Sequence, residues 1–192
     1  NDRGRTDLWL RDLDGDAPAR RLTSHEENDG AADFAGSGRG VYFLSSRGGS
    51  PQVWYLPLAG GEATQVTRLP LEVTSFRASP RGDRLVVALE VFPDCRDLDC
   101  TAKRLQDSQA AKQNGQAHDR LFVRHWDRWK DGRVSQLFSI ALDPGPRTRG
   151  EPVPLTASVD ADVPTMPHGG RQDFAFSPDG AQVVFAARVR AS

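Results

Sequence analysis

The feature that most constrains this chain is a turn motif that recurs three times. In each copy an aromatic residue is followed three positions later by Ser and six positions later by Gly, at 34–40, 76–82 and 174–180. Two copies contain Ser-Pro-x-Gly, in which Pro fixes the backbone φ and Gly tolerates a positive φ, so the motif predicts a tight turn. The first copy has Gly38 in place of Pro and lacks two residues after Gly40, which we interpret as variation within the repeat. A short apolar run follows each copy, as expected of a β-strand.

A second motif lies between the turns and also has three copies. Each copy alternates apolar with other residues, which is the pattern of a half-buried strand, and each ends in turn residues. The copies span 8–15, 53–60 and 137–144. Each is followed by a short segment that ends in Thr, at Thr23, Thr67 and Thr156. The motif therefore predicts a second hairpin in every repeat.

The spacing of the two motifs predicts the fold class. The second turn motif follows the first by 42 residues, and Thr67 follows Thr23 by 44 residues. A unit of about 40–45 residues with four strands is typical of a β-propeller blade. We therefore predict an all-β chain, a β-propeller fragment of about three four-stranded blades with one long insertion. The predicted units are partial blades at 8–23 and 173–189, a full blade at 33–67, and a blade with its insertion at 75–156.

The repeated aromatic residues are predicted to pack between neighbouring blades and not to bind a cofactor. They are Trp9, Phe34, Trp54, Phe76 and Phe174. A closed propeller has about four to eight blades, so the terminal strands of this arc need cover from another segment or chain. The sequence starts at Asn1 and not at Met, from which we expect a processed or excised piece of a longer protein.

The predicted insertion, residues 90–135, carries the candidate binding residues. These are Glu90, at the end of a strand, and the cluster Arg124, His125, Trp126, Asp127 and Trp129. Long insertions in a regular repeat are often functional. In a binding site, the two indoles could wall a pocket, Asp127 could attract a cation, and Arg124 or Arg128 could hold a carbonyl or carboxylate. The alternative is that the tryptophans pack the insertion onto the propeller while the charges pair at the surface, and that Glu90 is a solvated or structural carboxylate.

The rest of the insertion gives weaker structural signals. Segment 101–115 is polar and is compatible with one helix or with a loop. Segment 119–124 is predicted to be a strand, and 130–133 a turn. Cys95 and Cys100 are the only cysteines, which is too few for a zinc site, so the pair favours a local disulfide over two free thiols. A disulfide would indicate an oxidising compartment.

Motifs for catalysis and for several classes of partner are missing. There is no Gly-x-Ser-x-Gly elbow, no phosphate loop and no two-histidine metal motif, and none of the four histidines sits in a recognisable catalytic setting. We therefore predict no catalytic residue, no metal and no cofactor on this chain. The formal net charge of -1 gives no electrostatic reason to expect nucleic acid. No apolar run approaches the length of a membrane span.

Several of these stretches resemble a known family. The Ser-Pro-Asp-Gly turn at 177–180, the strand at 8–15 and the Arg-Leu-Thr ending at 21–23 resemble the propellers of the prolyl oligopeptidase family, and those of the TolB type. The stretch from Glu90 through both cysteines, followed by 119–129, looks like the bacterial dipeptidyl-peptidase and acylaminoacyl-peptidase branch of that family. The resemblance runs over essentially the whole chain.

The resemblance implies a two-domain serine peptidase. In such enzymes an N-terminal propeller caps a C-terminal α/β-hydrolase domain, which holds the catalytic Ser, Asp and His. This chain would be the propeller part of a periplasmic or secreted exopeptidase, with that hydrolase domain and short peptides as its partners. Residues 90–129 would then line the cavity that faces the peptidase domain. The alternatives are a TolB-like binding module with no peptidase attached, and a scaffold with no activity of its own.

Overall fold

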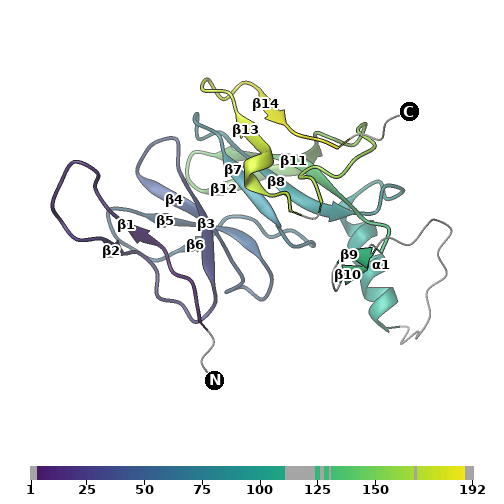
Figure 1. The fold of residues 1–192 in the computed structure, drawn as a ribbon, viewed down its shortest axis with the longest axis horizontal. Helices are drawn as coiled ribbons and strands as arrows, with labels where there is room; N and C mark the ends of the chain where they lie inside the picture. Colours follow the sequence, from purple (N-terminus) through teal and green to yellow (C-terminus); the bar gives the residue numbers. More distant parts are fainter. Residues whose placement is uncertain (1–3, 111–123, 126–127, 130, 167, 189–192) are drawn as a thin grey trace.

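The computed structural model describes residues 4–110, 124–125, 128–129, 131–166 and 168–188. Two four-stranded antiparallel sheets dominate it, with strand orders β3-β4-β5-β6 and β12-β11-β8-β7 (Figure 1). The first contains Asp29–Phe34 (β3), Gly40–Ser45 (β4), Gln52–Pro57 (β5) and Thr64–Gln65 (β6). The second contains Ser75–Ala78 (β7), Arg84–Val91 (β8), Val134–Asp143 (β11) and Arg147–Pro154 (β12). Each sheet is a meander, because its strands lie side by side in chain order.

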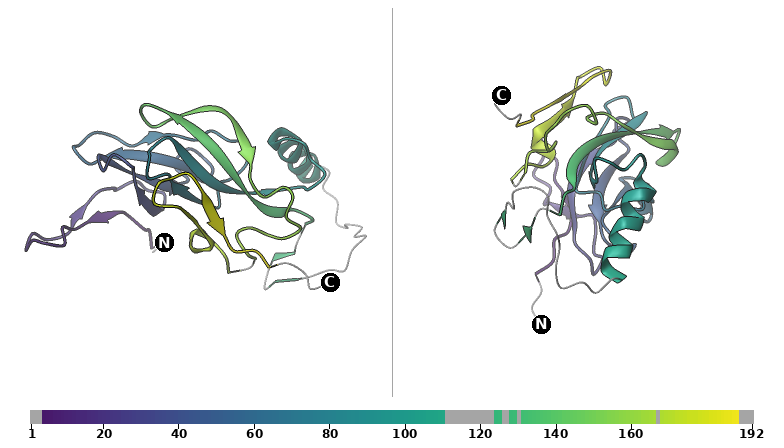
Figure 2. Two further views of the ribbon diagram at one scale, coloured as in Figure 1. Left: turned by 90° about the horizontal axis from the view of Figure 1, so that it is seen from above. Right: turned by 90° about the vertical axis from the view of Figure 1, so that its right-hand side faces the viewer.

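Shorter elements flank these two sheets. A hairpin of Trp9–Leu10 (β1) and Arg20–Arg21 (β2) precedes them, and one of Phe174–Phe176 (β13) and Val183–Phe185 (β14) follows them, after the 3-10 turn Arg171–Asp173 (η1). Between β8 and β11 the chain forms the helix Leu98–Ala110 (α1) and the strands Arg124–His125 (β9) and Arg128–Trp129 (β10). The sheets follow one another across Figure 1 from β1–β2 to β13–β14. Figure 2 shows α1 and the β13–β14 hairpin on different sides of the β7–β12 sheet.

The turn motif forms the same turn in three places, with a register that differs from the predicted one in the first copy. Gly38, Gly82 and Gly180 have φ values of 67°, 71° and 65°. The backbone N–H of each donates to the carbonyl three residues earlier, at 2.8–2.9 Å. The turn glycine of the first copy is therefore Gly38 and not Gly40, so the prediction that Gly40 matches Gly82 is wrong.

The threonine that ends each repeat has a structural function that the sequence pattern did not reveal. The hydroxyl oxygens of Thr23, Thr67 and Thr156 accept the backbone N–H of Leu8, Val53 and Leu137, at 2.9–3.0 Å. All three threonines are buried. A buried N–H without a partner is costly. The threonine hydroxyl, which follows β2, β6 or β12, supplies that partner.

Three apolar clusters lie between successive sheets. The first joins β1–β2 to the β3–β6 sheet around Phe43, the second and largest joins the β3–β6 and β7–β12 sheets around Phe76, and the third joins the β7–β12 sheet to β13–β14 around Phe174. Sheets that pack face to face in chain order, each a four-stranded meander, are the architecture of propeller blades. The predicted all-β propeller class is confirmed; the total number of blades stays a prediction, and so do the unit boundaries.

The predicted packing of the repeated aromatics is only partly correct. Phe76 and Phe174 are 0% and 2% exposed, and Trp54 packs against the first cluster. The prediction is wrong for Phe34, which is 58% exposed, and for Trp9, which is 61% exposed. Phe34 lies opposite Val41, the pair next to the turn, and Ala78 holds this position in the following sheet. Trp9 belongs to the terminal hairpin, beyond which Figure 1 shows no further sheet.

Candidate functional site

The insertion leaves and re-enters the β7–β12 sheet at neighbouring positions. Strand β8 ends at Val91 and strand β11 begins at Val134, and these two residues are opposite each other across the antiparallel pair. Glu90 therefore still belongs to β8, where it lies opposite Ser135. The insertion therefore starts and ends at one end of the sheet, while the turns at Gly82 and Pro146 lie at its other end.

Helix α1 is anchored at the base of the insertion. The Asp97 carboxylate accepts the backbone N–H of Cys100 at 2.7 Å, which caps the first turn of the helix. Thr101 is fully buried, and its hydroxyl accepts the backbone N–H of Phe92, just after β8, at 3.3 Å. Ala102 packs into the second apolar cluster, and Leu105 lies against it. The polar segment predicted as helix or loop is thus a helix as far as Ala110, and its remainder, 111–115, lies outside the described residues.

Covalent and ionic contacts reinforce this anchor. Cys95 and Cys100 form the predicted disulfide, with a Cα–Cα distance of 5.6 Å. Arg104 donates to both carboxylate oxygens of Asp94, at 2.8 and 3.0 Å, and its guanidinium lies 4.4 Å from the centroid of the Phe92 ring. The hydrogen bond from Arg104 lowers the pKa of Asp94. The contacts tie the start of α1 to the end of β8.

Glu90 is the predicted binding residue whose side chain the structure describes, and it belongs to an acidic cluster. Its carboxylate lies 3.1 Å from Nη1 of Arg133. Nε of the same arginine donates to Asp131 at 2.8 Å, and the backbone N–H of Arg133 donates to the other oxygen of Asp131 at 3.1 Å. Two carboxylates share one guanidinium, so among the described residues the cluster has one more negative than positive charge. All three side chains are partly exposed, at 27–32%, and the cluster can attract a cation.

Asp131 and Arg133 were not predicted as site residues. The sequence marks 130–133 only as a turn, and nothing in its composition identifies a partner for Glu90. The register of β8 against β11 brings the three residues together, because Arg133 immediately precedes the residue paired with Val91.

Three of the other predicted site residues, Arg124, His125 and Trp129, lie on a short hairpin. Strands β9 and β10 pair with Arg124 opposite Trp129 and His125 opposite Arg128. The structure describes only the backbone of these four residues. Trp126 and Asp127 lie outside the described residues, as does the strand predicted at 119–124 up to residue 123. The predicted pocket with two tryptophan walls therefore stays a prediction.

A shallow cavity of about 420 Å³ lies beside the disulfide. It is lined by acidic and basic residues and by both cysteines: Asp94, Cys95, Cys100, Lys103, Arg104 and Asp107. Among the described residues no three His, Cys, Asp or Glu side chains are grouped so as to hold a metal ion. No helix in the described part of the chain is long and apolar enough to cross a membrane.

The chain is similar to dipeptidyl peptidases over most of its length. It is 26% identical to dipeptidyl-peptidase 5 of Porphyromonas gingivalis over 186 residues, and 25% identical to that of Porphyromonas endodontalis over 190 residues, which cover 96% and 99% of this chain. It is 32% identical to dipeptidyl-peptidase 5 of Aspergillus fumigatus over 151 residues, or 73% of this chain. The chain spans 20–26% of the length of these relatives.

No family model matches the chain. A solved TolB structure from Agrobacterium tumefaciens aligns with a TM-score of 0.45 and 22% identity, over 72% of this chain and 38% of the other. The match to dipeptidyl peptidases over almost the entire chain confirms the resemblance to dipeptidyl peptidases seen in the sequence.

Proposed function

We propose that this chain is the non-catalytic propeller segment of an exported serine exopeptidase. It gates access to a C-terminal α/β-hydrolase domain and helps to position the amino terminus of a short peptide there. The relatives are named dipeptidyl peptidases and are about four times longer than this chain, which leaves room for such a domain. The Cys95–Cys100 disulfide supports an oxidising location, periplasmic or secreted.

The acidic cluster at the base of the insertion carries this proposal. A peptide α-amino group is mostly protonated near neutral pH. The Glu90–Asp131–Arg133 cluster has two carboxylates and one guanidinium, so it attracts a positive charge. Oε2 of Glu90 lies 3.1 Å from Nη1 of Arg133. The other oxygen can accept a hydrogen bond from an ammonium group without breaking the existing pair. Asp127 would supply a second carboxylate, Trp126 and Trp129 the apolar walls, and Arg124 and His125 polar contacts to the peptide backbone.

The firm attachment of Glu90 suits a residue that holds the end of a peptide at a fixed distance from the reacting bond. An exopeptidase must hold the peptide terminus at a fixed separation from the scissile bond. Glu90 and the residues before and after it in β8 all pair with β11. The disulfide and the cap on α1 fix the segment that follows. An ion pair shielded from bulk water is stronger than the same pair at an open surface, so cover from a second domain would strengthen the contact.

The test is the pair of substitutions Glu90→Gln and Asp127→Asn in the intact parent protein. We expect kcat/KM to fall roughly 10- to 100-fold on dipeptide substrates with a free amino terminus, because a hydrogen bond to a charged group contributes about 1.5–3 kcal/mol. Substrates with a blocked amino terminus should show little change. Glu72→Gln is the matched control, because Glu72 is an exposed carboxylate outside the insertion.

Equal and small effects on both classes of substrate, in variants that fold, would remove Glu90 and Asp127 as anchors. Glu90 would then be a structural partner of Arg133. The rival function is a TolB-like propeller that binds a protein partner and has no peptidase. The sequence of the parent protein after Ser192 decides between the two, because the peptidase requires a hydrolase segment with a Gly-x-Ser-x-Gly elbow.

A further inference from the structure

The first strands of successive sheets, β3, β7 and β13, are edge strands that lie next to one another, and we call them the inner strands. The backbone of β3 is distorted. Its register against β4 shifts between Gly30 and Asp33, and Ala31 has a φ of 51°, the only positive φ of a non-glycine residue in the described chain. A bulge of this kind changes the direction of the groups that follow it. Backbone strain of this type is found preferentially at functional sites. The bulge presents the carbonyl of Ala32 and the carboxylate of Asp33 to the neighbouring inner strands.

Arg171 reaches these groups from a distant part of the chain. It belongs to η1, just before β13, and its Nη1 donates to the carbonyl of Ala32 at 2.6 Å. Its Nη2 lies 3.5 Å from Oδ1 of Asp33, while Oδ2 of Asp33 accepts the backbone N–H of Ala78 in β7 at 3.2 Å. Groups from three successive sheets therefore meet at one place.

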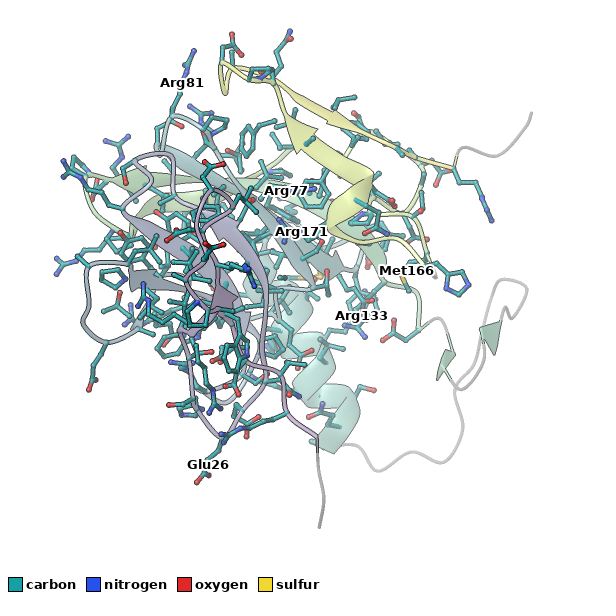
Figure 3. All side chains as sticks on the ribbon, turned by 60° about the vertical axis from the view of Figure 1, so that its left-hand side comes forward. Glu26, Arg77, Arg81, Arg133, Met166 and Arg171 are labelled. Carbon is teal, nitrogen blue, oxygen red and sulfur yellow. A yellow bond between two sulfur atoms is a disulfide. The ribbon has the colours of Figure 1, made fainter. Side chains whose placement is uncertain are left out.

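A second guanidinium lies beside the first. Nε of Arg77, on β7, donates to the carbonyls of Arg171 and Phe174, at 3.1 and 3.3 Å. Figure 3 shows Arg77 and Arg171 together beside η1. No described residue forms a hydrogen bond or an ion pair with the two terminal nitrogens of Arg77. Two guanidiniums and one carboxylate leave a positive charge in a partly buried position.

We propose that Arg77 and Arg171 form a binding site for the carboxylate of a short peptide. The class of ligand follows from the chemistry, because a guanidinium presents a planar fork of donors that matches two carboxylate oxygens. The charges support this ligand as well. Burial lowers the pKa of Arg171, Arg77 lowers it further, and Asp33 acts in the opposite direction. A bound anion would stabilise the charged form of Arg171. This proposal rests on the proposed function only because it takes a peptide as the ligand. The two arginines would bind the carboxylate of the substrate, whereas the Glu90 cluster would bind its amino terminus.

The site can be tested on the 192-residue chain by NMR titration. The probes are N-acetyl-dialanine, which has a free carboxylate, and N-acetyl-dialanine amide, which has none. The acetyl group removes the ammonium in both, so the result does not depend on the Glu90 cluster. We expect the acid to bind with a dissociation constant on the order of 1 mM, with shifts of the amide signals of Ala32 and Phe174, and the amide to bind at least about tenfold more weakly.

Substitutions then locate the site. Arg77→Gln and Arg77→Lys should both weaken binding of the acid, the second less because it keeps the charge without the fork. Arg39→Gln, at an exposed turn position, should leave binding unchanged. Equal binding of the acid and the amide by the unsubstituted chain would overturn the proposal, whether or not the variants fold. Binding that survives in folded Arg77→Gln would overturn it too, and the arginines would then only brace the inner strands.

Discussion

The threonine that ends each repeat recurs in the sequence because its buried hydroxyl forms a hydrogen bond inside the repeat. Thr67 is a good example, because its hydroxyl is fully buried, accepts the N–H of Val53 at 2.9 Å and donates to the side-chain oxygen of Gln52 at 2.7 Å. Gln52 in turn donates to the carbonyls of Leu69 and Leu71. The threonine therefore links strand β5 to the segment that leads into the next sheet.

Replacing Thr67 by Val should destabilise the chain by about 1–3 kcal/mol, because the N–H of Val53 is left buried without an acceptor. Thr67→Ser keeps the hydroxyl and should cost clearly less. Urea unfolding of both variants measures the difference. Equal stability of the Val and Ser variants would show that the hydroxyl contributes nothing beyond volume.

Tyr42 gives the chain a pH dependence at the alkaline end. Burial, with a smaller effect of Tyr55, raises the pKa of Tyr42 from 10.0 to about 12. The folded chain thus keeps a proton that the unfolded chain loses, so the associated stability is complete below pH 10 and declines as the pH rises towards 12. Tyr42→Phe keeps the ring against Tyr55 and should lose less stability over this range. Parallel unfolding curves for the two proteins at pH 9 and pH 11 would contradict the assignment.

At the scale of elements, α1 is the part whose position depends most on side-chain contacts, because no sheet pairing holds it. Replacing Cys95 and Cys100 together by Ala removes the covalent tie, and a loop of this length contributes about 2 kcal/mol. We expect faster hydrogen exchange in 98–105 and unchanged exchange in β8 and β11. Hydrogen exchange with mass spectrometry measures this, with Cys95→Ala plus Cys100→Ala compared against the unsubstituted chain. Loss of protection in both strands would mean that the helix stabilises the whole sheet.

Elements also show what the sequence could and could not predict. The strands and turns follow from Ser-Pro-x-Gly and from alternating apolar residues, which are local signals. The match of Gly40 with Gly82 and Gly180 is wrong, because Gly40 is required for a different reason: a Cβ there would lie 2.3 Å from the Tyr55 ring. The partners Glu90–Arg133 and Asp33–Arg171 depend on strand register and on packing between sheets, and no local pattern encodes these. The disulfide was predictable because both cysteines lie in one short segment.

At the scale of the whole molecule, stability is distributed over interfaces between neighbouring sheets. Each apolar cluster joins one sheet only to the next, so the chain should behave as a linear array in which the central interface matters most. The matched series Phe76→Ala, Phe174→Ala and Phe34→Ala tests this. These residues occupy the same motif in sequence but are 0%, 2% and 58% exposed.

We expect Phe76→Ala to cost about 3–5 kcal/mol and to weaken the entire chain. Phe174→Ala should mainly open the β13–β14 hairpin, and Phe34→Ala should change stability by less than about 0.5 kcal/mol. Urea unfolding gives the totals, and hydrogen exchange shows which strands open. A uniform loss of protection in the Phe174→Ala variant would show that the array unfolds as a single unit.

The pairing of Val91 with Val134 brings the two ends of the insertion together. Because the chain leaves and returns at adjacent positions, the pairing of β8 with β11 sets no fixed length for the segment between them. The entropy of closing a loop grows only with the logarithm of its length, so each doubling costs about 0.6 kcal/mol. Segments of different length and chemistry can therefore be exchanged at this junction while the scaffold stays the same. The junction is therefore a position at which another segment can be grafted while the strand pairing is kept.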